Sequence, residues 1–134
     1  MSEPATVAIP GSLIDDLVAE ATAGAPLEQC GLLIGRPGVV MRAFAARNAD
    51  AAASRYTVEP ADHFQALRSA RHDGLDVIGV WHSHPAGRAW PSATDIAEAH
   101  TDFLYLIVGL APAPDVRAWQ LVDGNFVQRH LVRT

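Results

Sequence analysis

Residues 77–85 read Val-Ile-Gly-Val-Trp-His-Ser-His-Pro, an apolar run that passes directly into two histidines. The β-branched and apolar residues from Val77 to Trp81 predict a central strand of a sheet. Side chains two apart on an extended chain point to the same face, so His82 and His84 can present two imidazoles to one point. That arrangement suits a metal ion, although a pair of histidines is by itself a weak signal.

The rest of the chain shows patterns typical of a domain that mixes strands and helices. Apolar residues at helical spacing predict three helices, one capped by Ser12 and ended by Gly24, one over Ala61–His72 and one over Ser92–Thr101. Apolar runs predict further strands, with one hairpin around the turn at Arg36-Pro37-Gly38 and another at Asp123-Gly124-Asn125. These lie at Cys30–Ile34, Val39–Ala45, Leu104–Leu110, Val116–Val122 and Phe126–Val132, with a short one at Arg55–Val58. We therefore expect one domain over residues 1–134 of the α/β (or α+β) class, with a mixed sheet of about six strands and three helices around it.

The bulk composition narrows the possible functions. With 134 residues, 49% of them hydrophobic, the chain can bury one core but is too short for two ordinary domains. A net charge of −5 without a basic cluster disfavours nucleic acid as a partner. Residues 1–10 lack the features of a signal peptide, and no apolar stretch approaches the roughly 18 residues of a membrane span, so a cytoplasmic protein is expected. The single cysteine, Cys30, excludes a multi-cysteine metal site, so any metal must be held by histidine and carboxylate.

Asp95 is the next candidate ligand, and its surroundings allow two interpretations. The stretch Ser92-Ala93-Thr94-Asp95 also matches a capping box, in which serine and an acidic residue three positions later satisfy backbone donors of the first helical turn. A carboxylate that ligates a metal is not expected to reach back to the cap as well. Ser92 could start the helix with its backbone and still turn its hydroxyl toward the metal. Spacing alone leaves the choice open for Asp95.

Two segments far apart in the chain together match a known family. His82-Ser83-His84-Pro85, followed after six residues by Ser92 and after two more by Asp95, reproduces the motif His-Ser-His-Pro-x6-Ser-x2-Asp. Upstream, residues 26–35 read Pro-Leu-Glu-Gln-Cys-Gly-Leu-Leu-Ile-Gly and resemble the segment that carries a catalytic glutamate. In both segments the chain resembles the JAMM metallopeptidases, also called MPN+ or Mov34, and in particular the stand-alone bacterial type. The resemblance implies a JAMM/MPN-like, cytidine-deaminase-like architecture.

The resemblance also assigns roles to these residues. It implies that His82, His84 and Asp95 bind Zn²⁺ and leave a fourth position for water, whose pKa such a zinc ion lowers to about 7. Glu28 would take a proton from that water and pass it to the departing amine. Ser92 would donate its hydroxyl to the oxyanion that develops on the carbonyl.

Neighbouring residues are not assigned catalytic roles. Cys30 is expected to be a small buried apolar residue at the start of a strand. Trp81 and Trp90 flank the motif and could either line a groove for an extended peptide or serve in packing. The remaining histidines have no partner at ligand spacing and are not expected to bind the metal: His63, His72, His100 and His130.

The resemblance further implies a class of substrate. Members of the family cut amide or isopeptide bonds after the C-terminal tail of ubiquitin or ubiquitin-like proteins, and the small bacterial ones resemble enzymes that remove amino acids from sulfur carrier proteins. We therefore expect a zinc metallopeptidase or isopeptidase that cleaves after a Gly-Gly tail, held by β-augmentation in a groove beside an edge strand. The short loops around the motif disfavour specificity for polyubiquitin.

Three other functions fit parts of the sequence. A non-catalytic MPN-type interaction module is the main alternative, but family members of that kind lack the ligands and the glutamate that this chain has. A zinc deaminase would need His-x-Glu and Pro-Cys-x-x-Cys, which one cysteine cannot supply. A DNA-associated relative is disfavoured by the acidic charge. The carrier protein, the type of bond and the oligomeric state stay open.

Overall fold

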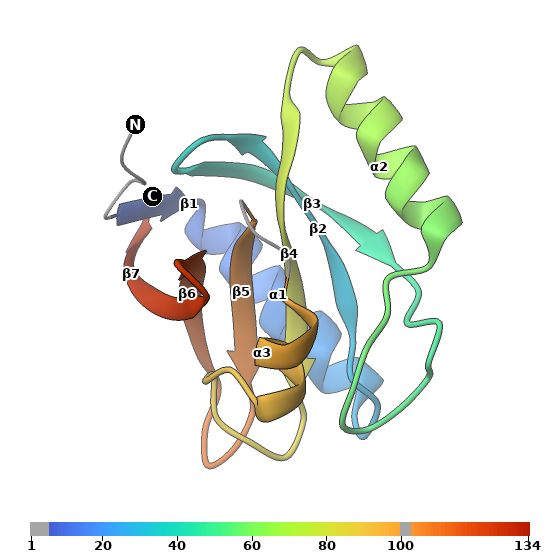
Figure 1. Cartoon of the computed structure of the whole chain (residues 1–134), viewed down its shortest axis with the longest axis vertical. Coiled ribbons are helices and arrows are strands. Elements are labelled where there is room, and N and C mark those ends of the chain that lie inside the picture. Colours follow the sequence, from blue (N-terminus) through green and yellow to red (C-terminus); the bar gives the residue numbers. More distant parts are fainter. Residues whose placement is uncertain (1–5, 100–102) are drawn as a thin grey trace.

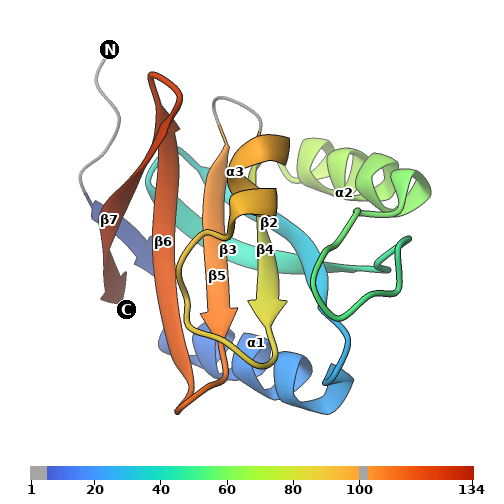
Figure 2. The same cartoon turned by 60° about the horizontal axis from the view of Figure 1, so that its bottom comes forward.

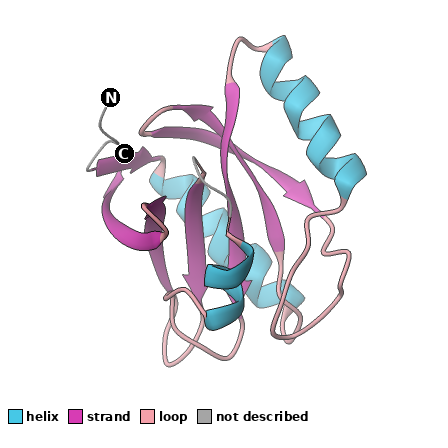
Figure 3. Cartoon of the chain, viewed as in Figure 1, coloured by secondary structure: helices cyan, strands magenta, loops and turns pink. Residues whose placement is uncertain are grey.

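The computed structural model describes residues 6–99 and 103–134, which form seven strands and three helices. Figure 1 labels them in chain order, and Figure 3 separates helices from strands by colour. The helices are α1 (Gly11–Gly24), α2 (Pro60–His72) and α3 (Ala93–Glu98). The strands are β1 (Thr6–Ile9), β2 (Cys30–Arg36), β3 (Val39–Ala46), β4 (Asp76–His84), β5 (Leu104–Gly109), β6 (Asp115–Val122) and β7 (Asn125–Arg133).

The strands form one mixed sheet in the order β1-β3-β2-β4-β5-β6-β7, which closes into a barrel where β1 pairs with β7. Strands β4 and β5 are parallel, and β1 is parallel to both of its neighbours, whereas the other pairs are antiparallel. The expectation of about six strands in a mixed sheet is therefore right in kind but wrong in number. The additional strand is Thr6–Ile9, four residues whose partners lie in distant parts of the chain.

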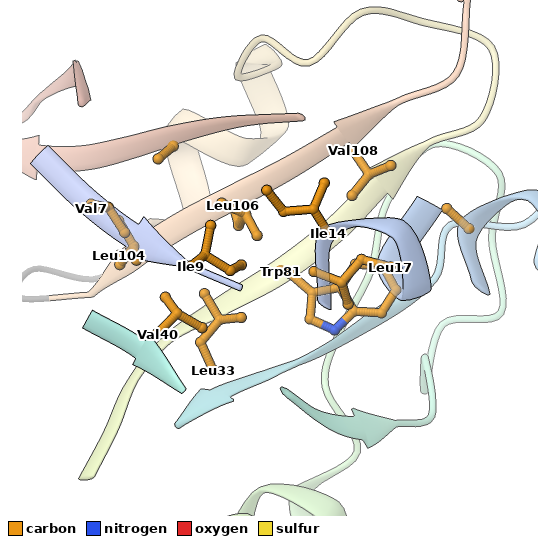
Figure 4. Packing of buried hydrophobic residues seen from close by; sticks show 12 residues of the cluster. Val7, Ile9, Ile14, Leu17, Leu33, Val40, Trp81, Leu104, Leu106 and Val108 are labelled. Atoms are coloured by element: carbon orange, nitrogen blue, oxygen red, sulfur yellow. The ribbon is translucent and has the colours of Figure 1, made fainter. Parts of the chain in front are cut away.

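The predicted central strand is confirmed as β4, and it extends through both histidines. His82 lies opposite Cys30 on β2 and opposite Ile107 on β5, so this end of β4 has a strand on each side. Because side chains alternate along a strand, Trp81 points to the face opposite that of His82. Trp81 is fully buried in the core cluster that contains Leu17, as Figure 4 shows. Its role is therefore packing.

Each face of the sheet packs against a different long helix, and Figure 2 shows α1 and α2 on different sides of the strands. Helix α1 buries Ile14, Leu17 and Ala21 against the cluster that holds Trp81. Helix α2 buries Ala66 and Ala70 against a second cluster on the other face. No helix among the described residues is both long and apolar enough to cross a membrane.

Both predicted hairpins are confirmed. Strands β2 and β3 pair in antiparallel register around the Arg36–Val39 turn. At the β6–β7 turn, Asp123 and Gly124 have φ values of 51° and 80°, the left-handed conformation that the Asp-Gly sequence favours in tight hairpins.

Two predicted helix ends and one predicted strand are wrong. Ser12 is not the N-cap of α1, because the helix begins one residue earlier, at Gly11, after the N-cap residue Pro10, whose backbone carbonyl accepts the first amides. Arg55–Val58 is not a strand, since Val58 forms only an isolated bridge with Asn48. Helix α3 ends at Glu98 rather than Thr101. His100 lies outside the described residues.

The packing of Trp81 on β4 constrains one residue of the segment that follows Glu28, namely Gly31 on β2. A Cβ atom added to Gly31 would lie 2.3 Å from the Trp81 Nε1 and 2.7 Å from the Phe44 carbonyl oxygen. Glycine is therefore required at this position by close packing between β2, β3 and β4.

We expect Gly31→Ala to lower the free energy of unfolding by about 1 to 3 kcal/mol, because the added methyl group overpacks a rigid region. Gly87→Ala is the matched control, since its nearest atom would be the His84 Cβ at 3.7 Å, and it should change stability by less than about 0.5 kcal/mol. Urea denaturation followed by circular dichroism measures both. Equal midpoints for the two variants would contradict the packing argument.

Candidate metal centre

Three ligand atoms from two elements converge at one point. The Nε2 atoms of His82 and His84, both at the end of β4, lie 3.2 Å apart. The Oδ2 atom of Asp95, in the first turn of α3, lies 3.2 Å from the His82 Nε2 and 3.0 Å from the His84 Nε2. All three side chains are largely buried, with exposed fractions of 1%, 13% and 8%. The structure thus brings together the three candidate ligands that the sequence motif contains.

The three atoms fit a single bound cation. Ligand atoms held about 2.0–2.1 Å from one zinc ion at tetrahedral angles lie about 3.3 Å from one another, close to the separations found here. Hydrogen bonding alone does not explain the arrangement. If each imidazole donated its Nε2–H to the Asp95 Oδ2, two protonated nitrogens would lie side by side only 3.2 Å apart. A cation between the three residues removes this conflict, because both Nε2 atoms can then turn a lone pair toward the cation together with the Asp95 oxygen.

The second nitrogen of His84 orients its ring for such a site. The Nδ1 atom lies 2.8 Å from the Arg88 carbonyl oxygen, so the Nδ1–H donates to this carbonyl, and in the neutral ring Nε2 then carries the lone pair that can bind a metal. Burial by itself lowers the pKa of His84, but the hydrogen bonds to Asp95 and Arg88 raise it above its usual value overall. For the fully buried His82, burial dominates and lowers the pKa, which favours the neutral ring that a metal requires.

Asp95 forms the capping box and faces the histidines with the same oxygen. The Ser92 backbone N–H donates to the Asp95 Oδ2 at 2.9 Å, and the Asp95 N–H donates to the Ser92 Oγ at 3.0 Å. The expectation that the carboxylate could not do both is therefore wrong. A carboxylate oxygen has two lone pairs, and the helix starts beside the end of β4, so cap and histidines lie within reach of one atom. Burial opposes ionisation, but hydrogen bonds to both histidines hold the pKa of Asp95 well below its usual range.

Ser92 is confirmed as the N-cap of α3. Its Oγ accepts the amide proton of Asp95 and its own hydroxyl proton remains available for donation. The cap therefore places a neutral hydrogen-bond donor next to Asp95.

Glu28 is a buried carboxyl group at the entrance to β2, with only 4% of the residue exposed. Its backbone is held on both sides, since its N–H donates to the Ala52 carbonyl and its carbonyl accepts from the Asn48 side chain. Burial raises the pKa of Glu28 to about 7, with smaller opposing effects from the charges of His84 and Asp95. A group with this pKa can both take up and release a proton at neutral pH.

The remaining candidates take no part in the ligand group. Cys30 is buried at the first residue of β2, and burial raises the pKa of its thiol to about 12, as expected of an inert core cysteine. Trp90 is 46% exposed and packs on Trp119, with the Arg117 guanidinium over its ring. His63, His72 and His130 lie outside the group formed by His82, His84 and Asp95.

A cavity of about 500 Å³ adjoins Asp95. Its wall is mainly apolar and includes Tyr56, Val80, Phe103 and Tyr105. Nothing in the sequence pattern predicts a role for Tyr56, whose ring stacks on His82. One nearby residue could have indicated an ordered turn before Tyr56. It is Asn48, because asparagine side chains commonly form hydrogen bonds with nearby backbone groups in turns.

The chain is similar in sequence to several named proteins. It is 32% identical to a probable TtuB-protein conjugate cleaving protease of Thermus thermophilus, over 89% of this chain and 78% of the relative. It is 27% identical to a desampylase of Pyrococcus furiosus, over 81% of this chain and 76% of the relative. It is 28% identical to a CysO-cysteine peptidase of Mycobacterium tuberculosis, over 87% of this chain and 83% of the relative.

Solved structures show the same fold. A protein from Desulfitobacterium hafniense superposes with a TM-score of 0.88 at 27% identity, over 96% of this chain and 93% of the other. A JAB1/MPN domain protein from Archaeoglobus fulgidus superposes with a TM-score of 0.60 at 18% identity, over 96% of this chain and all of the other. The second likeness concerns the fold alone.

The model of a protein family described as prokaryotic homologues of the JAB domain matches residues 10–122. This range includes Glu28 and the whole His-Ser-His-Pro to Asp95 motif, and the match confirms the resemblance to JAMM/MPN+ proteins. The chain therefore belongs to the family of prokaryotic homologues of the JAB domain.

Proposed function

We propose that this protein is a zinc-dependent metallopeptidase that hydrolyses the amide bond after the Gly-Gly tail of a ubiquitin-like or sulfur carrier protein. The observation that carries the proposal is the convergence of the His82, His84 and Asp95 ligand atoms in the same site as a buried Glu28 whose pKa is about 7. A scaffold without catalytic function would need neither the ligand geometry nor a carboxyl group with a pKa near neutrality.

His82, His84 and Asp95 would hold the ion, which when bound supplies Lewis acidity and lowers the pKa of water. Glu28 accepts a proton at its carboxylate from the attacking water and returns it to the departing amine, a double task that suits a pKa near the working pH. Ser92 donates its hydroxyl to the carbonyl oxygen as negative charge develops there. The cavity beside Asp95, with its mainly apolar wall, offers space for part of a substrate next to the ligand atoms.

The relatives support the proposed class of substrate. Their names refer to the cleavage of TtuB–protein conjugates, to desampylation and to a CysO–cysteine peptidase. By analogy, we take the substrate here to be a ubiquitin-like or sulfur carrier protein with an added amino acid or protein at its C-terminus. A Gly-Gly tail has no side chains, so it can pass through a narrow approach to the three ligand atoms.

The proposed β-augmentation needs to be placed on a particular strand. Since the sheet is closed, it offers no complete edge strand among the described residues. Strand β3 pairs with β1 only at Val39, so its later residues toward Ala46 have a described strand neighbour on the β2 side alone. This part of β3 lies next to Cys30 and leads toward Glu28, which makes it the best place for an added strand.

We expect Zn²⁺ to raise the thermal stability of the chelator-treated protein, by about 2.7 kcal/mol at 100 times the dissociation constant. Asp95→Asn keeps an oxygen for the Ser92 cap but loses the negative charge, so its zinc-dependent increase in Tm should be much smaller. Asp115→Asn, at an exposed ion pair with Arg117, is the control and should respond like the unmodified protein. A full response in Asp95→Asn would exclude Asp95 as a ligand.

Glu28→Gln should reduce kcat by about 10²- to 10⁴-fold while zinc binding persists, because the amide cannot relay a proton. The assay incubates the zinc-loaded protein with carrier proteins extended beyond Gly-Gly and measures the product masses. Glu20→Gln, a partly buried glutamate on α1, should cleave normally. Tail cleavage that continues at the normal rate in Glu28→Gln would refute the mechanism. If the unmodified protein binds zinc but cleaves no such carrier, the substrate class is wrong.

Ser92→Gly separates the catalytic role of the hydroxyl from its role as a helix cap. Glycine is only a few tenths of a kcal/mol worse than serine as an N-cap, so stability should hardly change. Loss of an oxyanion donor should lower kcat by about 10²- to 10³-fold with little change in KM. Steady-state kinetics together with thermal unfolding test this, and a kcat within threefold of normal would remove Ser92 from the mechanism.

A further inference from the structure

The two histidines of the metal centre are held in different ways. The His84 ring is fixed by its Nδ1–H bond to the Arg88 carbonyl. In contrast, the His82 Nδ1 is buried and has no hydrogen-bond partner within residues 6–99 and 103–134. Metal-binding histidines normally donate the second ring N–H to a carbonyl or carboxylate, which sets the plane of the ring. Another contact must therefore orient the His82 imidazole.

That contact is the ring of Tyr56. The centroids of the two rings lie 4.3 Å apart and their planes differ by 19°, which is a stacked arrangement. Rotation of the imidazole about its Cβ–Cγ bond would break this stacking, so Tyr56 limits the direction in which Nε2 points. Burial raises the pKa of the Tyr56 hydroxyl, so the ring stays uncharged at neutral pH.

Tyr56 lies in an irregular segment, residues 51–57, that has neither helix nor strand to hold it. The side chain of Asn48 takes over that task. Its Nδ2 donates to the Arg55 carbonyl at 3.1 Å, and its Oδ1 accepts the Thr57 N–H at 3.0 Å, so it holds the backbone on both sides of Tyr56. The Thr57 carbonyl also accepts the Ala49 N–H at 2.7 Å.

The same asparagine contacts the segment of the proposed acid/base. The Asn48 Nδ2 donates a second bond, at 3.0 Å, to the Glu28 carbonyl, and the Oδ1 accepts a second one from the Asp50 N–H. All four hydrogen-bonding positions of the amide are therefore in use. One half-buried side chain, that of Asn48, therefore connects the backbone of Glu28 to the backbone that carries the ring stacked on His82.

We propose that Tyr56 is a positioning residue that fixes the plane of the His82 imidazole by stacking. We further propose that Asn48 fixes the backbone of Tyr56 relative to that of Glu28. This inference rests on the proposed metallopeptidase function, because the direction of the His82 Nε2 matters only if it ligates a metal. Neither residue touches the reacting atoms in this proposal. Both act through His82 or Glu28.

Three variants test the stacking. Tyr56→Leu keeps an apolar side chain but removes the ring, whereas Tyr56→Phe keeps the ring and removes only the hydroxyl. Phe126→Leu is the matched control, because it removes a half-buried ring that packs edge-to-face on Tyr105 rather than on a candidate metal ligand. Thermal unfolding and circular dichroism establish that each variant is folded.

The first measurement is the Zn²⁺ dissociation constant, obtained by competition with a chromophoric chelator. We expect Tyr56→Leu to weaken Zn²⁺ binding by about 10- to 100-fold, the usual effect of losing a group that orients a ligand. The Tyr56→Phe variant should bind Zn²⁺ within about threefold of the unmodified protein, and Phe126→Leu should bind it with unchanged affinity. The second measurement is the visible absorption of the Co²⁺-substituted protein, whose band positions should change in Tyr56→Leu but not in Tyr56→Phe or Phe126→Leu.

Asn48→Asp tests the second half of the proposal. It keeps an acceptor for the Asp50 and Thr57 amides but removes both donors, so the bonds to the Glu28 and Arg55 carbonyls are lost. We expect the same change in the Co²⁺ spectrum as in Tyr56→Leu, together with a fall in kcat. An unchanged spectrum and kcat in Asn48→Asp would show that the Asn48 amide does not fix the positions of Tyr56 and Glu28.

Several outcomes would overturn the role of Tyr56. A normal Zn²⁺ affinity and Co²⁺ spectrum in Tyr56→Leu would show that stacking does not orient His82. Equal losses in Tyr56→Leu and Tyr56→Phe would assign the effect to the hydroxyl, and an equal loss in Phe126→Leu would assign it to general destabilisation. If the unmodified protein binds neither Zn²⁺ nor Co²⁺, it is the proposed function that fails.

Discussion

One carboxylate oxygen, the Oδ2 of Asp95, links the two parts of the molecule that form the site. It accepts the backbone N–H of Ser92, which starts α3, and it lies within 3.2 Å of the imidazole nitrogens at the end of β4. The short helix is thereby held against the strand, and the capping bond fixes the direction of the carboxylate. A local stabilising motif and a candidate metal ligand are in this protein the same group.

The alternation of side chains on β4 lets one strand serve both the core and the site. Trp81 enters the core beneath α1, while its neighbour His82 faces the other side. Strand β2 accommodates this arrangement because Gly31 leaves room for the indole, and it carries Glu28 just before its first residue. Disturbing the packing of these two strands should therefore affect the positions of His82 and Glu28, to which we assign catalytic roles only as a proposal, as well as stability.

The irregular segment between β3 and α2 shows how a loop without secondary structure can hold a precise position. Its backbone groups are bonded to a single asparagine side chain and to Glu28, rather than to a ladder of strands. A side chain can satisfy four backbone groups at once only if the chain turns tightly around it. Loops of this kind combine the freedom to present a functional side chain with the rigidity of a scaffold.

Sequence alone was enough to predict β4 with its two histidines, the β2–β3 and β6–β7 hairpins, helix α2 and the family, because periodicity, turn chemistry and motif spacing are local. Only the tertiary structure decided the rest. Strand β1 closes the sheet through partners at distant positions, and Arg55–Val58 is shaped by Asn48 rather than by its own β propensity. The dual contacts of Asp95, the raised pKa of Glu28 and the stacking of Tyr56 on His82 arise where segments far apart in the chain meet and exclude water. No local pattern records such contacts, since each depends on where the rest of the chain has folded.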